Sequence, residues 1–226
     1  MRAKAAAVLV FALAAAPVFS ITLTEVDANF SLLFIGSAPP DGFGGPSPVL
    51  QSVGASLPLA IGGPFFLEPT IDFFGTYYEW TGTRAVPTSI EAGPGFFTLG
   101  ALLTLQSGLS YPVSPVVTLG GSLGLDFILR FPFDFSADNA DRLAGKGPAL
   151  AYFFGKGRFF SPETRFFVRW QVSETTGLVF NARVVYPVHH LWDGEGLPFV
   201  DQLMVSAGLG FVIRLSRQPP PADASP

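Results

Sequence analysis

The chain has 226 residues, enough for one domain with a substantial core, and its hydrophobic residues reach 49% while its charged residues stay at 13%. A chain this apolar would aggregate in water unless lipid or a partner covered it, which disfavours an ordinary soluble domain. The net charge of −4 lacks the basic footprint of a nucleic-acid-binding protein, and zero cysteines exclude disulfides and thiolate metal sites.

Residues 1–20 have the pattern of a cleavable export signal. Arg2 and Lys4 precede an apolar run from Ala5 to Phe19, and small residues stand at the positions before Ile21 that a signal peptidase inspects. The run of about 15 residues is shorter than the ~20 residues of a membrane-spanning helix. An uncleaved anchor is the alternative, but we expect the mature protein to begin at Ile21.

After residue 20 the dominant pattern has a period of two. Leu123, Leu125 and Phe127, for example, alternate with Gly124 and Asp126, and the last apolar segment of the chain repeats this pattern. Such runs exceed the mean strand of ~5–6 residues and match the ~9–11 residues that cross a bilayer at a tilt. The sequence therefore predicts long β-strands with one apolar and one polar face.

We expect eight strands, at residues 22–36, 48–61, 65–79, 95–107, 114–131, 163–172, 177–188 and 199–215. Short turns are expected at Gly62 to Pro64, Gly108 to Val113 and Ser173 to Thr176, and long loops at 37–47, 80–94, 132–162 and 189–198. Short turns at one end and long loops at the other are typical of outer-membrane barrels. The sequence predicts a closed antiparallel β-barrel over residues 21–216, followed by a flexible periplasmic tail at 217–226.

Two segments leave alternatives. The stretch from Pro148 to Phe160 is apolar enough for a ninth strand, which would place the termini on opposite sides of the membrane. We interpret it as a hairpin extension or a packed segment of the third long loop. The uncharged window from Gly95 to Val113 is the best candidate for a membrane helix, but the alternation of Phe97 and Leu99 with Thr98 favours a strand.

An eight-stranded barrel has a narrow interior that side chains nearly fill or that holds one small ligand, which disfavours a general porin. We expect the carboxylates of Glu68, Asp72 and Asp126 to lie among Arg169, Arg183 and Arg214. Two interpretations stay open: a salt-bridge network that plugs the lumen, or a polar conduit or gate. The alternation places ten charged residues on the inner face: Glu25, Asp27, Glu68, Asp72, Asp126, Arg130, Arg165, Arg169, Arg183 and Arg214.

Aromatic residues of the outer face are expected to anchor the barrel at the two lipid boundaries. Those near the predicted strand ends are Phe65, Tyr77, Phe166, Trp170 and Tyr186. Trp80 and Trp192 fall in or beside loops, where they either pack at the barrel rim or contact lipopolysaccharide or a surface ligand.

His189 and His190, followed by Asp193 and Glu195, are candidates for metal ligands or a general base. Adjacent side chains of an extended segment point in opposite directions, and no H-E-x-x-H spacing occurs. We therefore expect no metal and no cofactor. No G-x-S-x-G motif is present, so a lipid-modifying enzyme is the least favoured function.

With an export signal, eight alternating segments, long outer loops and a lumen of mixed charge, residues 22–215 resemble the small barrels grouped around OmpW, OmpX and OmpA. The resemblance rests on pattern and on no residue motif. It implies a place in the outer membrane of a Gram-negative bacterium, contact with its lipid, and insertion by its assembly machinery. Many such proteins end on an aromatic residue of the last strand, whereas here Phe211 is followed by Ile213, Leu215 and the tail.

The resemblance leaves three functions open. An OmpW-like channel would carry small hydrophobic molecules, and the inward positions of Phe74, Leu102, Val179 and Val185 would allow a partly apolar lumen. An OmpX-like surface protein would bind a host or surface partner through its loops, above all 132–162. A purely structural barrel would bind no ligand. We favour a narrow, charge-lined barrel with a structural or surface-interaction role.

Overall fold

The computed structural model describes residues 21–39, 45–88, 95–133 and 140–215. The predicted signal peptide, residues 1–20, and the predicted tail, residues 217–226, lie outside the described residues.

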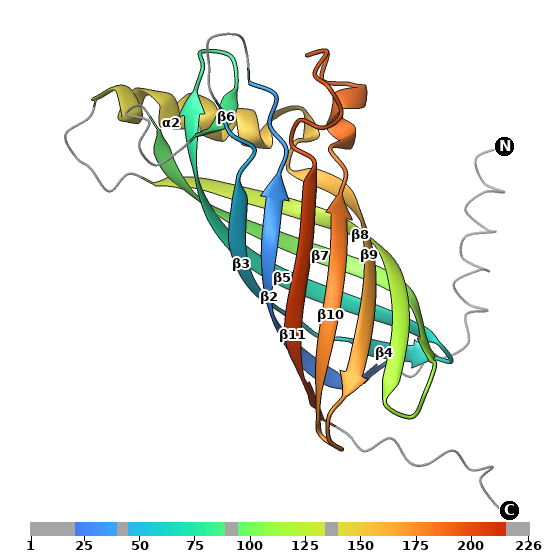
Figure 1. Cartoon of the computed structure of the whole chain (residues 1–226). Coiled ribbons are helices and arrows are strands. Elements are labelled where there is room, and N and C mark those ends of the chain that lie inside the picture. Colours follow the sequence, from blue (N-terminus) through green and yellow to red (C-terminus); the bar gives the residue numbers. More distant parts are fainter. Residues whose placement is uncertain (1–20, 40–44, 89–94, 134–139, 216–226) are drawn as a thin grey trace, which may run out of the picture.

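Eight long strands close into one antiparallel barrel (Figure 1). Each strand pairs with the next along the chain, and β11 returns to pair with β2 over their whole lengths, with Leu209 opposite Phe30. The prediction of a closed antiparallel barrel of about eight strands is therefore confirmed. The strands are β2 (Glu25–Ile35), β3 (Val49–Ser56), β5 (Phe65–Trp80), β7 (Phe96–Pro112), β8 (Val117–Phe133), β9 (Phe160–Gln171), β10 (Thr176–Val185) and β11 (Met204–Arg214).

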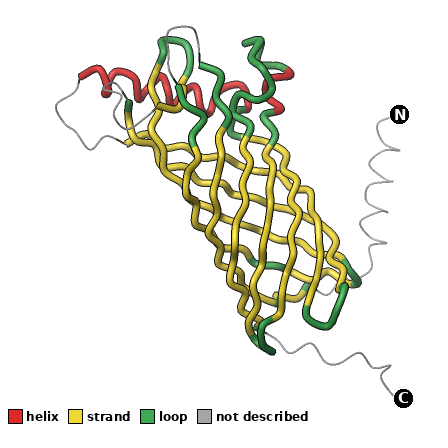
Figure 2. Tube along the Cα trace, in the orientation of Figure 1, coloured by secondary structure: helices red, strands yellow, loops and turns green. Residues whose placement is uncertain are grey.

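Three short strands extend this barrel at its ends. At the short-turn end, β1 (Thr22–Leu23) pairs with β4 (Leu59–Gly62), which in turn pairs with β5. At the opposite end β6 (Ala85–Thr88) pairs with the last residues of β5. Figure 2 shows the resulting asymmetry, with short turns at one end and longer connections at the other.

The structure corrects the predicted turn at Gly108 to Val113. Strand β7 continues to Pro112, and the turn lies at residues 113–116. Gly108 is needed for a close approach within the sheet, because a Cβ there would come within 2.2 Å of the carbonyl oxygen of Gly121. The helix alternative for this window is wrong, since it forms a strand. The last barrel strand also begins later than predicted, at Met204.

The third long connection contains α2 (Ala140–Phe154) and the short helix η1 (Gly155–Gly157), and α2 lies across the loop end of the barrel (Figure 1). Its buried residues Ala149, Tyr152 and Phe153 have helical spacing and pack with Tyr78 and Phe96 of the barrel. The apolar stretch is thus a packed loop segment, as one of the two interpretations held, but it is helical and forms no hairpin. Within the described residues, no helix has the length and apolar content that a membrane span requires.

The two faces of the strands differ as the alternation predicts. Phe166 has 53% of its surface exposed and points outward, whereas the next residue, Phe167, is 1% exposed and points into the lumen. Leu125 and Leu209 share the outward face with many other exposed apolar side chains, while Ser122 is buried inside. A closed sheet leaves no unpaired edge, and an apolar belt around it is the surface that lipid requires.

Candidate functional site: the barrel lumen

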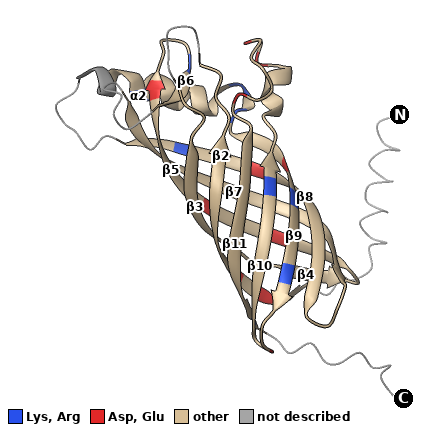
Figure 3. Cartoon of the chain, in the orientation of Figure 1, with Lys and Arg blue, Asp and Glu red and all other residues tan. Residues whose placement is uncertain are grey.

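The structure places all ten charged residues predicted for the lumen on the inner face of the barrel. Eight are buried, while Arg169 and Arg214 are partly exposed. Figure 3 shows that acidic and basic residues are spread along the barrel strands and are not gathered at one end.

The largest ion-pair cluster surrounds the Arg183 guanidinium on β10. Its Nε and Nη2 donate to Glu163 Oε2 at 3.0 and 2.6 Å, and its Nη1 donates to Asp72. Nη2 also donates to Thr104 Oγ1 at 3.0 Å and lies 3.8 Å from Asp126 Oδ1, to which the Thr104 hydroxyl donates. One cation therefore joins carboxylates from three other strands, β5, β8 and β9. Hydrogen bonds between ionised groups of this kind are the stronger ones.

Glu163 is the charged member of this cluster that is missing from the ten residues expected on the inner face. It is the first residue of the strand predicted at 163–172. Because Glu163 stands two residues before Arg165, the alternation of a strand places both on the same, inward face, and this spacing is the signal that identifies Glu163.

A second ion pair joins Arg165 Nη1 to Glu68 Oε1 at 2.5 Å, and both side chains are buried. The Phe167 ring lies between two arginines, with the guanidinium carbons of Arg165 and Arg169 at 5.1 and 5.2 Å from its centroid. Phe167 also packs edge to face against Phe66, at 5.7 Å between centroids. Aromatic rings thus pack beside this pair.

The third cluster lies at the short-turn end. Arg169 contacts Glu25 at 2.5 Å and Asp27 at 3.1 Å, and Arg214 Nε lies 3.9 Å from Glu25. The expectation that Arg169 and Arg214 would lie among Glu68, Asp72 and Asp126 is therefore confirmed only in part: both line one pocket with Glu68, but their ion pairs are with Glu25 and Asp27. Arg214 is the direct cross-strand partner of Glu25 on β2, and Arg169 is two residues from the end of β9. Both arginines therefore reach the acidic residues of β2.

An apolar layer follows the Arg183 cluster toward the loop end. Phe74, Leu102 and Val185 were predicted on the inner face and belong to this layer, whereas Val179 packs with Phe66 and Phe167 instead. All members have at most 3% of their surface exposed. The layer consists of Leu33, Ile35, Phe74, Leu102, Ile128, Val185 and Met204.

Helix α2 covers the loop end of the lumen. The Phe153 ring packs edge to face on Tyr78 at 5.0 Å between centroids, and the Arg130 guanidinium lies 5.3 Å from the Phe153 centroid. Arg130 therefore contacts the aromatic cluster of the cap instead of the ion pairs deeper in the barrel. A pocket of about 480 Å³ opens at the other end, where Glu25, Arg169 and Arg214 line it.

Two of the predicted aromatic anchors lie at the short-turn end and two at the loop end. Phe65 begins β5 and Trp170 is the penultimate residue of β9, and both are exposed. Tyr77 and Tyr186 lie near the loop end and are partly exposed. Phe166 is in the middle of its strand because β9 starts at Phe160, earlier than predicted, so the strand-end position assigned to it is wrong.

The loops are joined to one another by polar contacts. The Asp201 carboxylate accepts from Ala38 N at 2.8 Å, and the Arg158 guanidinium pairs with Glu195. Trp192 Nε1 donates to the carbonyl of Lys156 at 2.7 Å, although its ring remains 56% exposed. These contacts hold the fourth loop and the residues after it against the first and the third loops.

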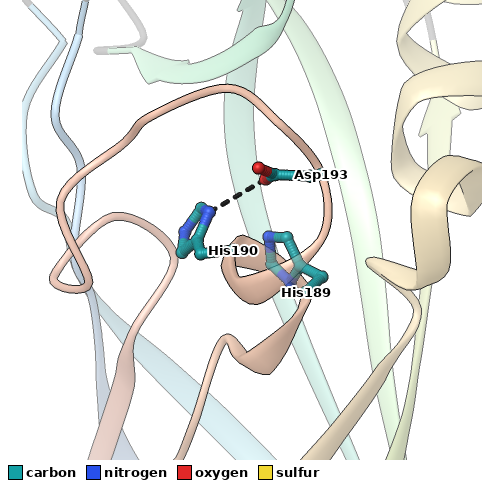
Figure 4. Close-up of side chains that lie close together, drawn as sticks. All are labelled: His189, His190 and Asp193. Carbon is teal, nitrogen blue, oxygen red and sulfur yellow. Dashed lines mark hydrogen bonds and ion pairs between the residues drawn. The ribbon is translucent and has the colours of Figure 1, made fainter.

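Trp80 and the two histidines also belong to the loop end. Trp80 packs at the rim, 6.0 Å from Tyr152 between ring centroids. His189 and His190 lie on the helical turn η2 (Val188–Leu191), with ring centroids 4.3 Å apart (Figure 4). The expectation that their side chains point in opposite directions is therefore wrong, because it assumed an extended backbone.

The environment of this turn controls the protonation of its side chains. Burial, together with the neighbouring His190, lowers the pKa of His189 to about 3, so this imidazole is neutral at physiological pH. Burial alone would raise the pKa of Asp193, but the backbone N–H of Glu195 and the His190 side chain lower it below its ordinary value. Asp193 is therefore a carboxylate.

No known family profile matches the sequence, and no curated protein matches it. Solved structures do match the fold. Neisserial surface protein A is 10% identical, with a TM-score of 0.54 over 86% of this chain and 99% of that one. The outer membrane protein OprG from Pseudomonas aeruginosa is also 10% identical, with a TM-score of 0.52 over 86% of this chain and 98% of that one. The resemblance to small outer-membrane barrels is thus confirmed for the fold.

The fold and the outer surface together define the class of protein. A closed antiparallel barrel with an apolar outer belt satisfies every backbone hydrogen bond inside lipid, and among bacterial proteins this is the architecture of the outer membrane. The chain has the fold of the small eight-stranded β-barrels of bacterial outer membranes.

Proposed function

We propose that the protein is a closed barrel with a charge-plugged lumen, whose role in the outer membrane is structural or a surface interaction made by its loop end. The observation that carries this proposal is the Arg183 cluster, in which one guanidinium contacts Asp72, Glu163 and Thr104 from three surrounding strands. A steady aqueous pathway needs a continuous wet pore, and these side chains occupy the space where it would run.

The apolar layer supplies a second barrier in series with the ion pairs. An ion that passed Arg183 would next meet Phe74, Leu102 and Met204, which are packed together and have at most 3% of their surface exposed. A dry apolar constriction opposes ion passage because an ion there would lose its hydration. The two barriers together support a barrel that does not serve general diffusion.

The loop end supports the surface-interaction part of the proposal. Leu191, Trp192, Phe199 and Val200 are exposed there. Exposed apolar and aromatic side chains on a held surface are the usual anchors of protein contacts. The contacts of Trp192 with Lys156 and of Asp201 with Ala38 keep that surface in place.

Planar-bilayer recording of the wild-type protein tests the proposal. We expect little conductance, and Arg183→Ala should increase it only modestly because the apolar layer remains. Arg214→Ala, at the open short-turn end, is the matched control and should leave the conductance unchanged. A wild-type barrel with large, steady, porin-like conductance would contradict the plugged lumen.

An OmpW-like channel for small hydrophobic molecules is the second candidate, and the apolar layer is the observation that favours it. A ligand in transit could displace part of the contact between Phe74 and Leu102. Binding of an environment-sensitive apolar fluorophore to the reconstituted barrel tests this function. Saturable binding that Leu102→Gln abolishes would support the channel, and fluorescence that does not depend on this residue would exclude it.

A further inference from the structure

The only two histidines of the chain lie side by side at the loop end, and the chain has no cysteine. His189, His190 and Asp193 each offer one possible ligand atom, and these three atoms lie within 4.8 Å of one another. Figure 4 shows the two rings and the carboxylate converging within one turn of the fourth loop. All the imidazole ligands that the protein could offer a metal ion are therefore at one place.

Each ring nitrogen of His190 has one short contact. Nε2 lies 2.8 Å from the carbonyl oxygen of Asp201, which can only accept, so Nε2 is the donor there. The other ring nitrogen, Nδ1, lies 3.0 Å from Asp193 Oδ2. Either a hydrogen bond between Nδ1 and Oδ2 or a metal ion bound to both atoms would account for this second contact.

His189 distinguishes these two possibilities. Its side chain is 1% exposed, and neither ring nitrogen has a hydrogen-bond partner among the described residues. Burying an unpartnered polar group is costly, and a proton shared by His190 and Asp193 would do nothing for His189. A metal ion bound by all three side chains would engage one nitrogen of this unpartnered imidazole as well.

We propose that His189, His190 and Asp193 bind one divalent transition-metal ion, best matched by Zn²⁺, which fastens the fourth loop over the barrel. Imidazole nitrogen and carboxylate oxygen are ligands that zinc prefers, and three protein ligands leave a fourth position for water. Two ligands on one zinc ion lie about 3.0–3.5 Å apart given their usual bond lengths, which matches the contact between His190 and Asp193.

The surroundings have the features of a metal site's outer shell. The carbonyl of Asp201 orients the His190 ring, and the backbone N–H of Glu195 donates to Asp193 Oδ1 at 2.9 Å, leaving Oδ2 for the ion. The nearby Arg158 is paired with Glu195, which offsets its charge. Leu191, within the same turn, is 80% exposed, so the site lies close to solvent.

Metal titration of the full mature chain, produced without a histidine tag, tests the proposal. After chelator treatment and refolding in detergent, the protein is titrated with Zn²⁺ in competition with a chromogenic chelator. We expect one equivalent to bind and the thermal unfolding temperature to rise with Zn²⁺. Absence of saturable binding at one equivalent would overturn the proposal.

Variants assign the binding to these residues. His189→Ala and Asp193→Asn should each weaken Zn²⁺ binding at least about tenfold, since even outer-shell losses cost that much. Asp201→Asn is the matched control, because its side chain holds Ala38 instead and its carbonyl still reaches His190; binding should be unchanged. Equal binding by His189→Ala and wild type would show that His189 is not a ligand and would overturn the three-residue site.

Nitrogen-15 spectra of the wild-type imidazoles keep the test valid if a variant fails to fold. Only two histidines contribute, so the assignment is simple. Zn²⁺ should shift one ring nitrogen of each histidine. A spectrum in which His189 does not respond would refute the three-residue site.

Discussion

Replacing Arg183 with alanine should destabilise the barrel by about 3 kcal/mol, within the range of 3–5 kcal/mol for breaking a buried ion pair. The substitution removes the donor that Glu163 accepts from at 3.0 and 2.6 Å and the cation that contacts Asp72. The other oxygens of Asp72, Asp126 and Glu163 have no hydrogen-bond partner among the described residues, so the lost contacts of Arg183 are the main ones that Asp72 and Glu163 have. We expect the lower end of the range because Asp126 keeps the hydrogen bond that the Thr104 hydroxyl donates to it.

Arg214→Ala is the control for this measurement. Arg214 is also an inward-facing arginine, but its side chain is 32% exposed and its Nε is 3.9 Å from Glu25. Its loss should cost about 0–1 kcal/mol, as for exposed ion pairs. Denaturant unfolding in lipid vesicles, followed by the fluorescence of the three tryptophans, measures both. Equal losses, or a loss below about 1 kcal/mol for Arg183→Ala, would refute the account of the cluster.

Two further pairs of substitutions test the faces of the barrel and the packing of its strands. Leu209→Arg should destabilise the barrel by roughly 2–4 kcal/mol because it exposes a charge to lipid. Ser122→Arg, on the lumen face, should avoid this transfer cost. Equal losses of unfolding free energy in lipid vesicles would show that the faces are assigned wrongly. Gly108→Ala should destabilise by about 1–3 kcal/mol because its Cβ would meet a backbone oxygen at 2.2 Å. Gly121→Ala, where the nearest atom is 3.5 Å away, should be tolerated; the opposite order of stabilities would exclude this explanation.

The face that each strand residue occupies could be predicted from sequence because alternation is a local property. The change from the exposed Phe166 to the buried Phe167 follows from the alternation of side chains along a strand. The partners of the lumen charges could not be predicted in the same way. Arg183 and Asp72 are 111 positions apart on strands that are not neighbours in the sheet, so their contact depends on the tilt and stagger of the closed barrel.

The loop end was less predictable for a different reason. The buried positions Ala149, Tyr152 and Phe153 have helical spacing, but they lie beside Phe154, Phe159 and Phe160, which make the whole stretch uniformly apolar and hide the period. At the histidine turn, a single local choice between an extended and a helical backbone decides whether two adjacent rings diverge or converge. Sequence alternation elsewhere in the chain carries no information about that choice.

The accessibility of a cysteine introduced into the lumen tests most directly whether the lumen is plugged. The chain has no cysteine, so Ser52→Cys, a nearly isosteric change at a lumen position that is 4% exposed, introduces one thiol without background. Thr175→Cys in an exposed turn is the accessible control. In lipid vesicles, a charged, water-soluble thiol reagent should modify Thr175→Cys quickly and leave Ser52→Cys unmodified from either side. Modification of Ser52→Cys at the rate of the control would contradict the plugged lumen and indicate an open aqueous path.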